Sequence, residues 1–197
     1  MVSLKTKSLS ELLIVYNNLD KSPKKERGSL FERIVFEMLQ HSGLKSEPSH
    51  KAVTGEQIDR SFRFADKLYP VQAEYESRQL SLDKIEKFDT TVLKWFGNPR
   101  GLVVSASGLR PGAIMRLVHQ PSPRLILFTG GNLLAVLTEK VKLSRVLERK
   151  IKATEERKKP LLEVSDFENY EYEETESIRK TDKYTALLGA RQKAPAS

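Results

Sequence analysis

Residues 55–77 read GEQIDRSFRFADKLYPVQAEYES. Polar and apolar residues alternate along this stretch, which predicts two β-strands at 57–64 and 71–76. The letters ADK predict a short turn between them, and Pro70 is tolerated at the start of the second strand. The stretch is therefore expected to form a β-hairpin.

Polar side chains gather on one face of this hairpin. Because side chains alternate between the faces of a strand, Gln72, Glu74 and Glu76 share a face, and Asp59 points away from the apolar side chains of the first strand. Pairing of the strands would bring Asp59 beside Gln72 or Glu74. Such an oxygen-only ligand set favours Mg²⁺ or Mn²⁺ over zinc. The alternative is an ordinary solvent-facing side of a hairpin.

The rest of the chain alternates between helix and strand patterns. Helical spacing of apolar residues predicts helices at 8–20, 29–43, 81–96, 110–119 and 143–159. Short all-apolar runs predict buried strands at 101–107 and 124–129. This order predicts an α/β fold in which a central mixed β-sheet is flanked by helices on both faces.

Composition narrows the functional class. The 197 residues are 39% hydrophobic and 30% charged, which is typical of a globular protein. The absence of cysteine excludes disulfides, thiolate zinc sites and a thiol nucleophile. A net charge of +8 favours an anionic partner, with nucleic acid as the first candidate. No apolar run is long enough to span a membrane and the N-terminus lacks a signal-peptide core, so a cytoplasmic location is expected.

Four segments follow one another as they do in a known nuclease superfamily. They are FERIVFEMLQHSG, GEQIDRSFRF, YPVQAEYES and GLVVSASGLRPGAI. Over about residues 28–137 the chain resembles the restriction-endonuclease-like PD-(D/E)xK superfamily, and most of all its Mrr-like branch. The resemblance implies a restriction-endonuclease-like core and a Mg²⁺- or Mn²⁺-dependent endodeoxyribonuclease. Such an enzyme hydrolyses phosphodiester bonds of double-stranded DNA in defence against foreign or modified DNA, and a homodimer would cut both strands.

The resemblance assigns roles to four residues. Glu32 matches the glutamate of the first core helix, Asp59 the metal-binding aspartate and Gln72 the second strand ligand. The motif lysine falls on Glu74, which is the departure from the family pattern. Asp59, Gln72 and Glu74 are thus the expected metal ligands, and Glu32 joins them as a catalytic candidate. An alternative for Glu32 is a capping box with Ser29 at a helix N-terminus.

The missing lysine bears on whether the chain cleaves DNA. In the family this lysine orients the attacking water and adds positive charge, and losing one such electrostatic group costs on the order of 10²–10³ in kcat. Glu74 could itself hold or deprotonate the water, as in some restriction enzymes similar to this group. Alternatively Arg78 or Lys84 could reach back with a cation. If neither occurs, the chain is a degenerate nuclease that acts as a nucleic-acid-binding or protein-interaction module, for example with a partner protein in a defence system.

Further residues are candidates for binding nucleic acid. A cation or hydroxyl that could contact phosphate is offered by Lys24, Lys25, Arg27, Arg78, Lys84, Ser105 and Ser107. The basic helix at 143–159 could do the same or form a solvated face.

Three regions are expected along the chain. They are an N-terminal helix with a basic loop at 1–27, the core at 28–160 and an acidic, partly flexible tail at 161–197. The tail is either simply solvated or folds back over a basic groove in competition with nucleic acid.

Overall fold

A computed structural model describes residues 8–47, 60–95, 99–120 and 123–168. The chain divides into two compact units, Met1–Val164 and Ser165–Ser197. The predictions for Asp59 and for nearly all of the acidic tail lie outside the described residues. The first unit holds the sheet and the helices that position the candidate site.

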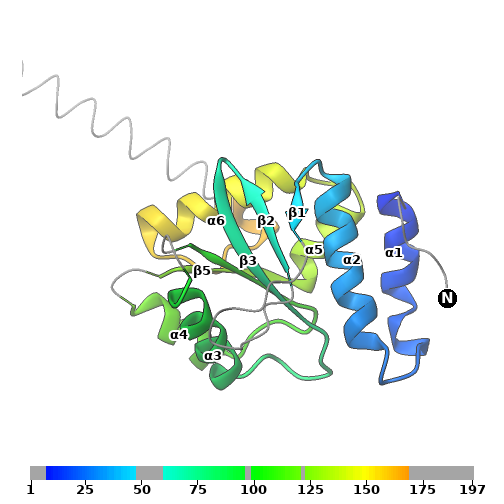
Figure 1. Ribbon diagram of the computed structural model, residues 1–197, viewed down its shortest axis with the longest axis horizontal. Helices are drawn as coiled ribbons and strands as arrows, with labels where there is room; N and C mark the ends of the chain where they lie inside the picture. Colours follow the sequence, from blue (N-terminus) through cyan, green and yellow to red (C-terminus); the bar gives the residue numbers. More distant parts are fainter. Residues whose placement is uncertain (1–7, 48–59, 96–98, 121–122, 169–197) are drawn as a thin grey trace, which may run out of the picture. The chain divides into compact units, whose positions relative to one another are not determined.

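A mixed five-stranded sheet forms the centre of the first unit (Figure 1). Its strands lie side by side in chain order: β1 Ser46–Glu47, β2 Arg60–Phe64, β3 Lys67–Glu74, β4 Gly101–Ser105 and β5 Leu125–Thr129. The pairs β1–β2 and β2–β3 are antiparallel, whereas the pairs β3–β4 and β4–β5 are parallel. The predicted α/β class with a mixed sheet is confirmed.

Helices cover both faces of this sheet. They are α1 Leu9–Asn17, α2 Arg27–His41, α3 Leu82–Leu93, α4 Pro111–Val118, α5 Gly130–Leu137 and α6 Leu143–Arg157. Two short 3₁₀ helices are η1 Leu19–Lys21 and η2 Val164–Asp166. Ser8 and Glu11 form a capping box at the start of α1. No helix among the described residues is both long and apolar enough to cross a membrane.

Helices α3 and α4 pack together on one face (Figure 1). The apolar stripe of α3, represented by Phe88 and Val92, lies against Val103 and Leu125 of the sheet. Gly101 permits this close approach, because a Cβ atom there would lie 2.7 Å from a ring carbon of Phe88. The hydrophobic spacing in the sequence thus sets the face on which α3 docks.

Helix α2 covers the opposite face. Arg60 of β2 places its guanidinium 4.6 Å from the ring centroid of Phe36, and the rings of Phe31 and Tyr75 lie 5.5 Å apart. Arg60 pairs in register with Val71, so the side chain of Val71 also belongs to this α2-covered face.

The hairpin turn differs from the prediction. Strand β3 begins at Lys67 and includes Pro70, and the turn consists of Ala65 and Asp66 in the left-handed region, with φ of 47° and 60°. Two-residue turns of this hand match the twist of an antiparallel pair, which lets the strands pair up to the turn. Strand β4 joins only from Val71 onward, so Pro70 precedes the three-stranded part of the sheet. The predicted start of the second strand, at residue 71, was therefore wrong, because β3 begins at Lys67.

The segment after α6 completes the edge of the sheet. The backbone N–H of Leu127 donates to Pro160 at 3.0 Å. The fully buried ammonium of Lys150 donates to the carbonyls of Leu127 and Leu162, at 2.7 and 2.5 Å. The compact unit accordingly continues to Val164, four residues past the predicted end of the core at residue 160.

Candidate functional site

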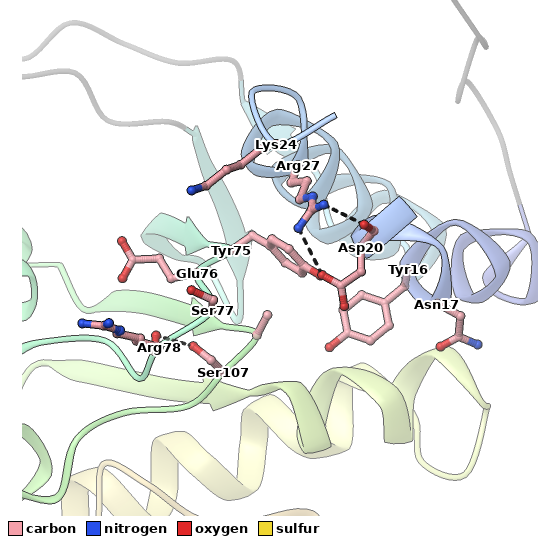
Figure 2. A pocket seen from close by; sticks show the side chains of 11 residues that line it. Tyr16, Asn17, Asp20, Lys24, Arg27, Tyr75, Glu76, Ser77, Arg78 and Ser107 are labelled. Atoms are coloured by element: carbon pink, nitrogen blue, oxygen red, sulfur yellow. Dashed lines mark hydrogen bonds and ion pairs between the residues drawn. The ribbon is translucent and has the colours of Figure 1, made fainter. Parts of the chain in front are cut away.

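A cleft of about 820 Å³ opens where β3 and β4 end (Figure 2). The loops that follow these strands form one side, and the segment between α1 and α2 forms the other. Tyr16, Asn17 and Asp20 line the cleft, and sequence reasoning gave them no role because they lie far along the chain from the strand motif. The carboxyl ends of parallel strands are where open α/β sheets commonly bind ligands.

Polar side chains of β3 lie beside this cleft, on the face covered by α3. Gln72 pairs in register with Val103, and Glu74 pairs with Ser105. Since Val103 belongs to the core beneath α3, Gln72 and Glu74 lie on that same face. The shared face predicted for Gln72 and Glu74 is what the register gives.

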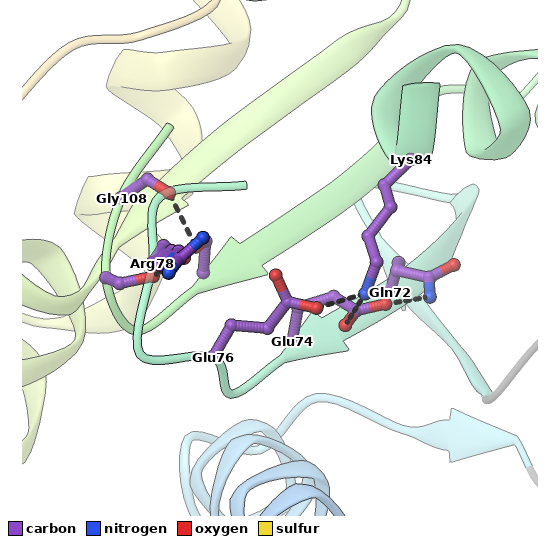
Figure 3. A network of polar contacts seen from close by, with 8 residues as sticks. Gln72, Glu74, Glu76, Arg78, Lys84 and Gly108 are labelled. Carbon is purple, nitrogen blue, oxygen red and sulfur yellow. Dashed lines mark hydrogen bonds and ion pairs between the residues drawn. The ribbon is translucent and has the colours of Figure 1, made fainter. Parts of the chain in front are cut away.

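Four side chains form a connected network: Gln72, Glu74, Glu76 and Lys84 (Figure 3). The Gln72 amide donates to Glu74 Oε1 at 2.8 Å, and the Lys84 ammonium donates to Glu74 Oε2 at 3.0 Å. Lys84 also donates to Glu76. Both oxygens of the Glu74 carboxylate are therefore held, and the cation comes from the first turn of α3.

Lys84 occupies an unusual place for a cation. The N-terminal turn of a helix carries partial positive charge, which disfavours a lysine there. Burial would lower the pKa of Lys84, but hydrogen bonds to Glu76 and Glu74 outweigh it and raise that pKa. Lys84 is thus held in its charged form by the two carboxylates.

Arg78, the other cation considered at this position, does not join the network. Figure 3 shows its side chain apart from Lys84, beside the loop of Gly108. Among the described residues no group of three or more His, Cys, Asp or Glu side chains is arranged to hold a metal ion. A metal site here would need the amide of Gln72 or a residue outside that part of the chain.

The alternative interpretation of Glu32 as a helix cap is wrong. Helix α2 begins at Arg27, and the Ser29 hydroxyl donates back to the Glu26 carbonyl at 3.0 Å. Glu32 therefore lies one turn inside the helix, where it is half-buried. Helix α2 packs on the face of the sheet opposite Gln72. The catalytic role of Glu32 therefore stays a prediction.

The serine candidates stabilise the loops. Ser105 is buried and its hydroxyl donates to the Gly108 carbonyl at 2.8 Å, while the Ser107 hydroxyl donates to the Arg78 carbonyl at 2.7 Å. Gly108 adopts a φ of 78°, which favours glycine. Both hydroxyl protons are thus used within the protein, and the loop after β3 is tied to the loop after β4.

Arg27 likewise closes a loop. Its guanidinium donates to the carbonyls of Ser22 and Asp20, at 2.9 and 2.6 Å, and pairs with the Asp20 carboxylate at 3.4 Å. Lys24 and Lys25 of the same loop are exposed.

Tyr75 connects this loop to the end of β3. Its hydroxyl donates to Asp20 Oδ1 at 2.9 Å. Burial, together with the hydrogen bond to Asp20, raises the pKa of Tyr75 to about 12. Burial and the charge of Asp20 also raise the pKa of Tyr16. Asp20 therefore carries the charge that links both tyrosines to Arg27.

No protein-family model matches this chain, and a search of curated proteins gives no match. Similar solved structures include a protein of unknown function, AF1548, with 11% identity and a TM-score of 0.49 over 62% of this chain and 76% of that one. The DNA modification-dependent restriction endonuclease AspBHI has 11% identity and a TM-score of 0.49 over 78% of this chain and 43% of its own. The MspJI restriction endonuclease, solved with a 27-mer oligonucleotide, has 13% identity and a TM-score of 0.44 over 78% and 39%. This chain spans less than half the length of either restriction endonuclease, and all three TM-scores lie below 0.5.

Proposed function

We propose that this chain is a metal-dependent endodeoxyribonuclease with a restriction-endonuclease-like core. It would resemble Mrr-like type IV restriction enzymes and hydrolyse phosphodiester bonds of double-stranded DNA in defence against foreign or modified DNA. The observation that carries the proposal is the Lys84 ammonium, 3.0 Å from Glu74 Oε2. A cation thus stands beside the residue that occupies the lysine position of the family motif.

The donor set suits a hard divalent ion. Glu74 and Glu76 offer carboxylates, Gln72 offers an amide oxygen, and Asp59 directly precedes the first residue of β2. We assign Asp59, Gln72 and Glu74 as the ligands, because Mg²⁺ and Mn²⁺ prefer such oxygen donors. When bound, the ion would supply positive charge at the phosphate and lower the pKa of a bound water.

Lys84 would replace the lysine of the family motif, whose position is occupied by Glu74 in this chain. Its ammonium is fixed by two carboxylates, so it is oriented before substrate arrives. The Lys84 ammonium would then stabilise the negative charge that develops on the phosphate oxygens. Glu74 would hold this ammonium in place, and the Gln72 amide would fix the Glu74 carboxylate. The ammonium of a lysine on α3 would then have the same role as the ammonium of the strand lysine in the family.

The test is cleavage of supercoiled plasmid DNA by the purified chain with Mg²⁺ or Mn²⁺. Asp59→Asn and Glu74→Gln are expected to abolish cleavage. Lys84→Met is expected to reduce the rate by about 10²–10³, which is the cost of removing one electrostatic group. Lys87→Met is the matched control, since Lys87 is an exposed lysine three residues further along α3.

A charge-conserving variant makes the assignment of Lys84 sharper. Lys84→Arg keeps a cation at the same position of α3 and should retain more of the rate than Lys84→Met does. Cleavage that persists in Asp59→Asn or Glu74→Gln would contradict the proposed site. An equal loss in Lys84→Met and Lys87→Met would remove Lys84 from it.

A second candidate is a nucleic-acid-binding protein that does not cleave. It is favoured by the same network, because both oxygens of Glu74 and one oxygen of Glu76 already accept hydrogen bonds from protein side chains. This candidate predicts salt-sensitive DNA binding and intact plasmid with every divalent ion. The wild-type cleavage measurement separates the two.

A further inference from the structure

Two cations of the cleft have no acidic partner among the described residues. Lys24 comes from the loop before α2, and Arg78 comes from the loop after β3. Neither side chain forms an ion pair with a carboxylate in that part of the chain, and both are exposed. Their charges are therefore available to a ligand.

The acidic side chains that line the cleft already contact cations. Asp20 pairs with Arg27, and Glu76 shares the ammonium of Lys84 with Glu74. The lining contains three cations, Lys24, Arg27 and Arg78, and two carboxylates, Asp20 and Glu76, so it has one excess positive charge. In Figure 2 Glu76 lies between the Lys24 side chain, above it in the view, and Arg78, below it.

The loops that carry the two cations are held in place. Tyr75 and Arg27 both bind Asp20, which ties the loop of Lys24 to the end of β3. The Ser107 hydroxyl binds the Arg78 carbonyl, which fixes the backbone of the second loop. A site whose backbone is fixed in this way loses little entropy when it binds.

We propose that Lys24 and Arg78 form a clamp for the backbone of a nucleic-acid strand, in which each cation contacts one phosphate, so that the cleft receives the nucleotide next to the bond held at Glu74. This rests on the proposed function, and Glu76 is the connection because it lines the cleft and contacts Lys84. The volume of about 820 Å³ lies in the range of small-ligand sites and has room for one nucleotide. The clamp recognises the backbone and is independent of base sequence.

The experiment measures binding apart from cleavage. Fluorescence anisotropy of a labelled DNA duplex and of its single strand is recorded without divalent ions, from about 50 to about 200 mM salt. Lys24→Ala and Arg78→Ala are each expected to reduce the slope of log K against log salt by about 1, and the double variant by about 2. Lys140→Ala is the control, because Lys140 is exposed after α5 and does not line the cleft. It should leave the slope unchanged.

The outcomes separate the clamp from the nuclease. The clamp would be overturned if both single variants had the salt slope of the wild type, even if the chain cleaves plasmid. It would also be overturned if Lys140→Ala reduced the salt slope as much as Lys24→Ala and Arg78→Ala do. Wild-type chain that binds neither DNA at low salt would overturn it too. Reduced slopes in a chain that cuts no DNA would support the clamp and refute the nuclease. Circular dichroism of each variant shows whether the fold is kept.

Discussion

The Tyr75 hydroxyl is the titrating group whose environment is best defined. Its pKa is raised to about 12 by burial and by the hydrogen bond to Asp20. Because the folded state favours the protonated phenol, the stability it contributes is present below about pH 10 and is lost as the pH rises toward about 12. Asp20→Asn should lower the pKa of Tyr75, since it removes the negative charge but leaves the burial.

Phenolate absorbance during an alkaline titration measures this shift. The chain contains six tyrosines, so the signal of Tyr75 is obtained as the difference from the Tyr75→Phe variant. A Tyr75 titration that is the same in the Asp20→Asn variant as in the wild type would show that burial alone sets the pKa.

At the same scale, the sequence identified some site residues and missed others. Strand periodicity was sufficient to group Gln72 with Glu74, and proximity along the chain was sufficient to name Lys84 as a cation within reach of Glu74. Tyr16 and Asp20 were missed, because their place beside Tyr75 depends on how α1 and η1 pack against distant elements. No local pattern encodes that packing.

Among the elements, the turn between β2 and β3 holds an alanine in a strained backbone conformation. Ala65 has a φ of 47°, and a left-handed conformation costs an L-residue roughly 1–2 kcal/mol. Ala65→Gly should therefore raise the free energy of unfolding by about 1 kcal/mol, after the entropy cost of glycine. Urea denaturation should show a higher midpoint with an unchanged m-value.

The matched control places the same substitution in a helix. Ala135→Gly in α5 should lower the free energy of unfolding by about 0.5–1 kcal/mol. Glycine relieves no strain in a helix and has more conformational freedom to lose when the chain folds. If Ala65→Gly and Ala135→Gly changed the free energy of unfolding in the same direction, the role assigned to the turn would be contradicted.

The elements themselves were largely predictable from periodicity. The spacing of Ile85, Phe88 and Val92 gave α3 and its buried face. The basic pattern at 143–159 gave α6, but not the burial of Lys150 inside it. A buried lysine is indistinguishable from a surface one in sequence, because its burial depends on carbonyls supplied by β5 and by residue 162.

At the scale of the whole molecule, the end of the compact unit is set by buried polar contacts. The Glu163 carboxylate accepts hydrogen bonds from Thr129 and Asn132 at the start of α5, at 2.8 and 2.9 Å. Leu162 supplies one of the two carbonyls that bind the Lys150 ammonium. The predicted core ended at residue 160, because these contacts leave no signal in composition.

A chain that ends at Lys159 should therefore be less stable than a chain that ends at Val164. Hydrogen bonds to a charged group contribute about 1.5–3 kcal/mol each, and a buried ammonium that loses a partner adds a desolvation cost. We expect a loss of about 3 kcal/mol or more, measured as a lower urea midpoint for the shorter chain. Lys150→Met should recover part of this loss in the shorter chain, where the ammonium lacks Leu162, and should destabilise the longer one. Equal midpoints for the two chains would mean that residues 160–164 add nothing to the core.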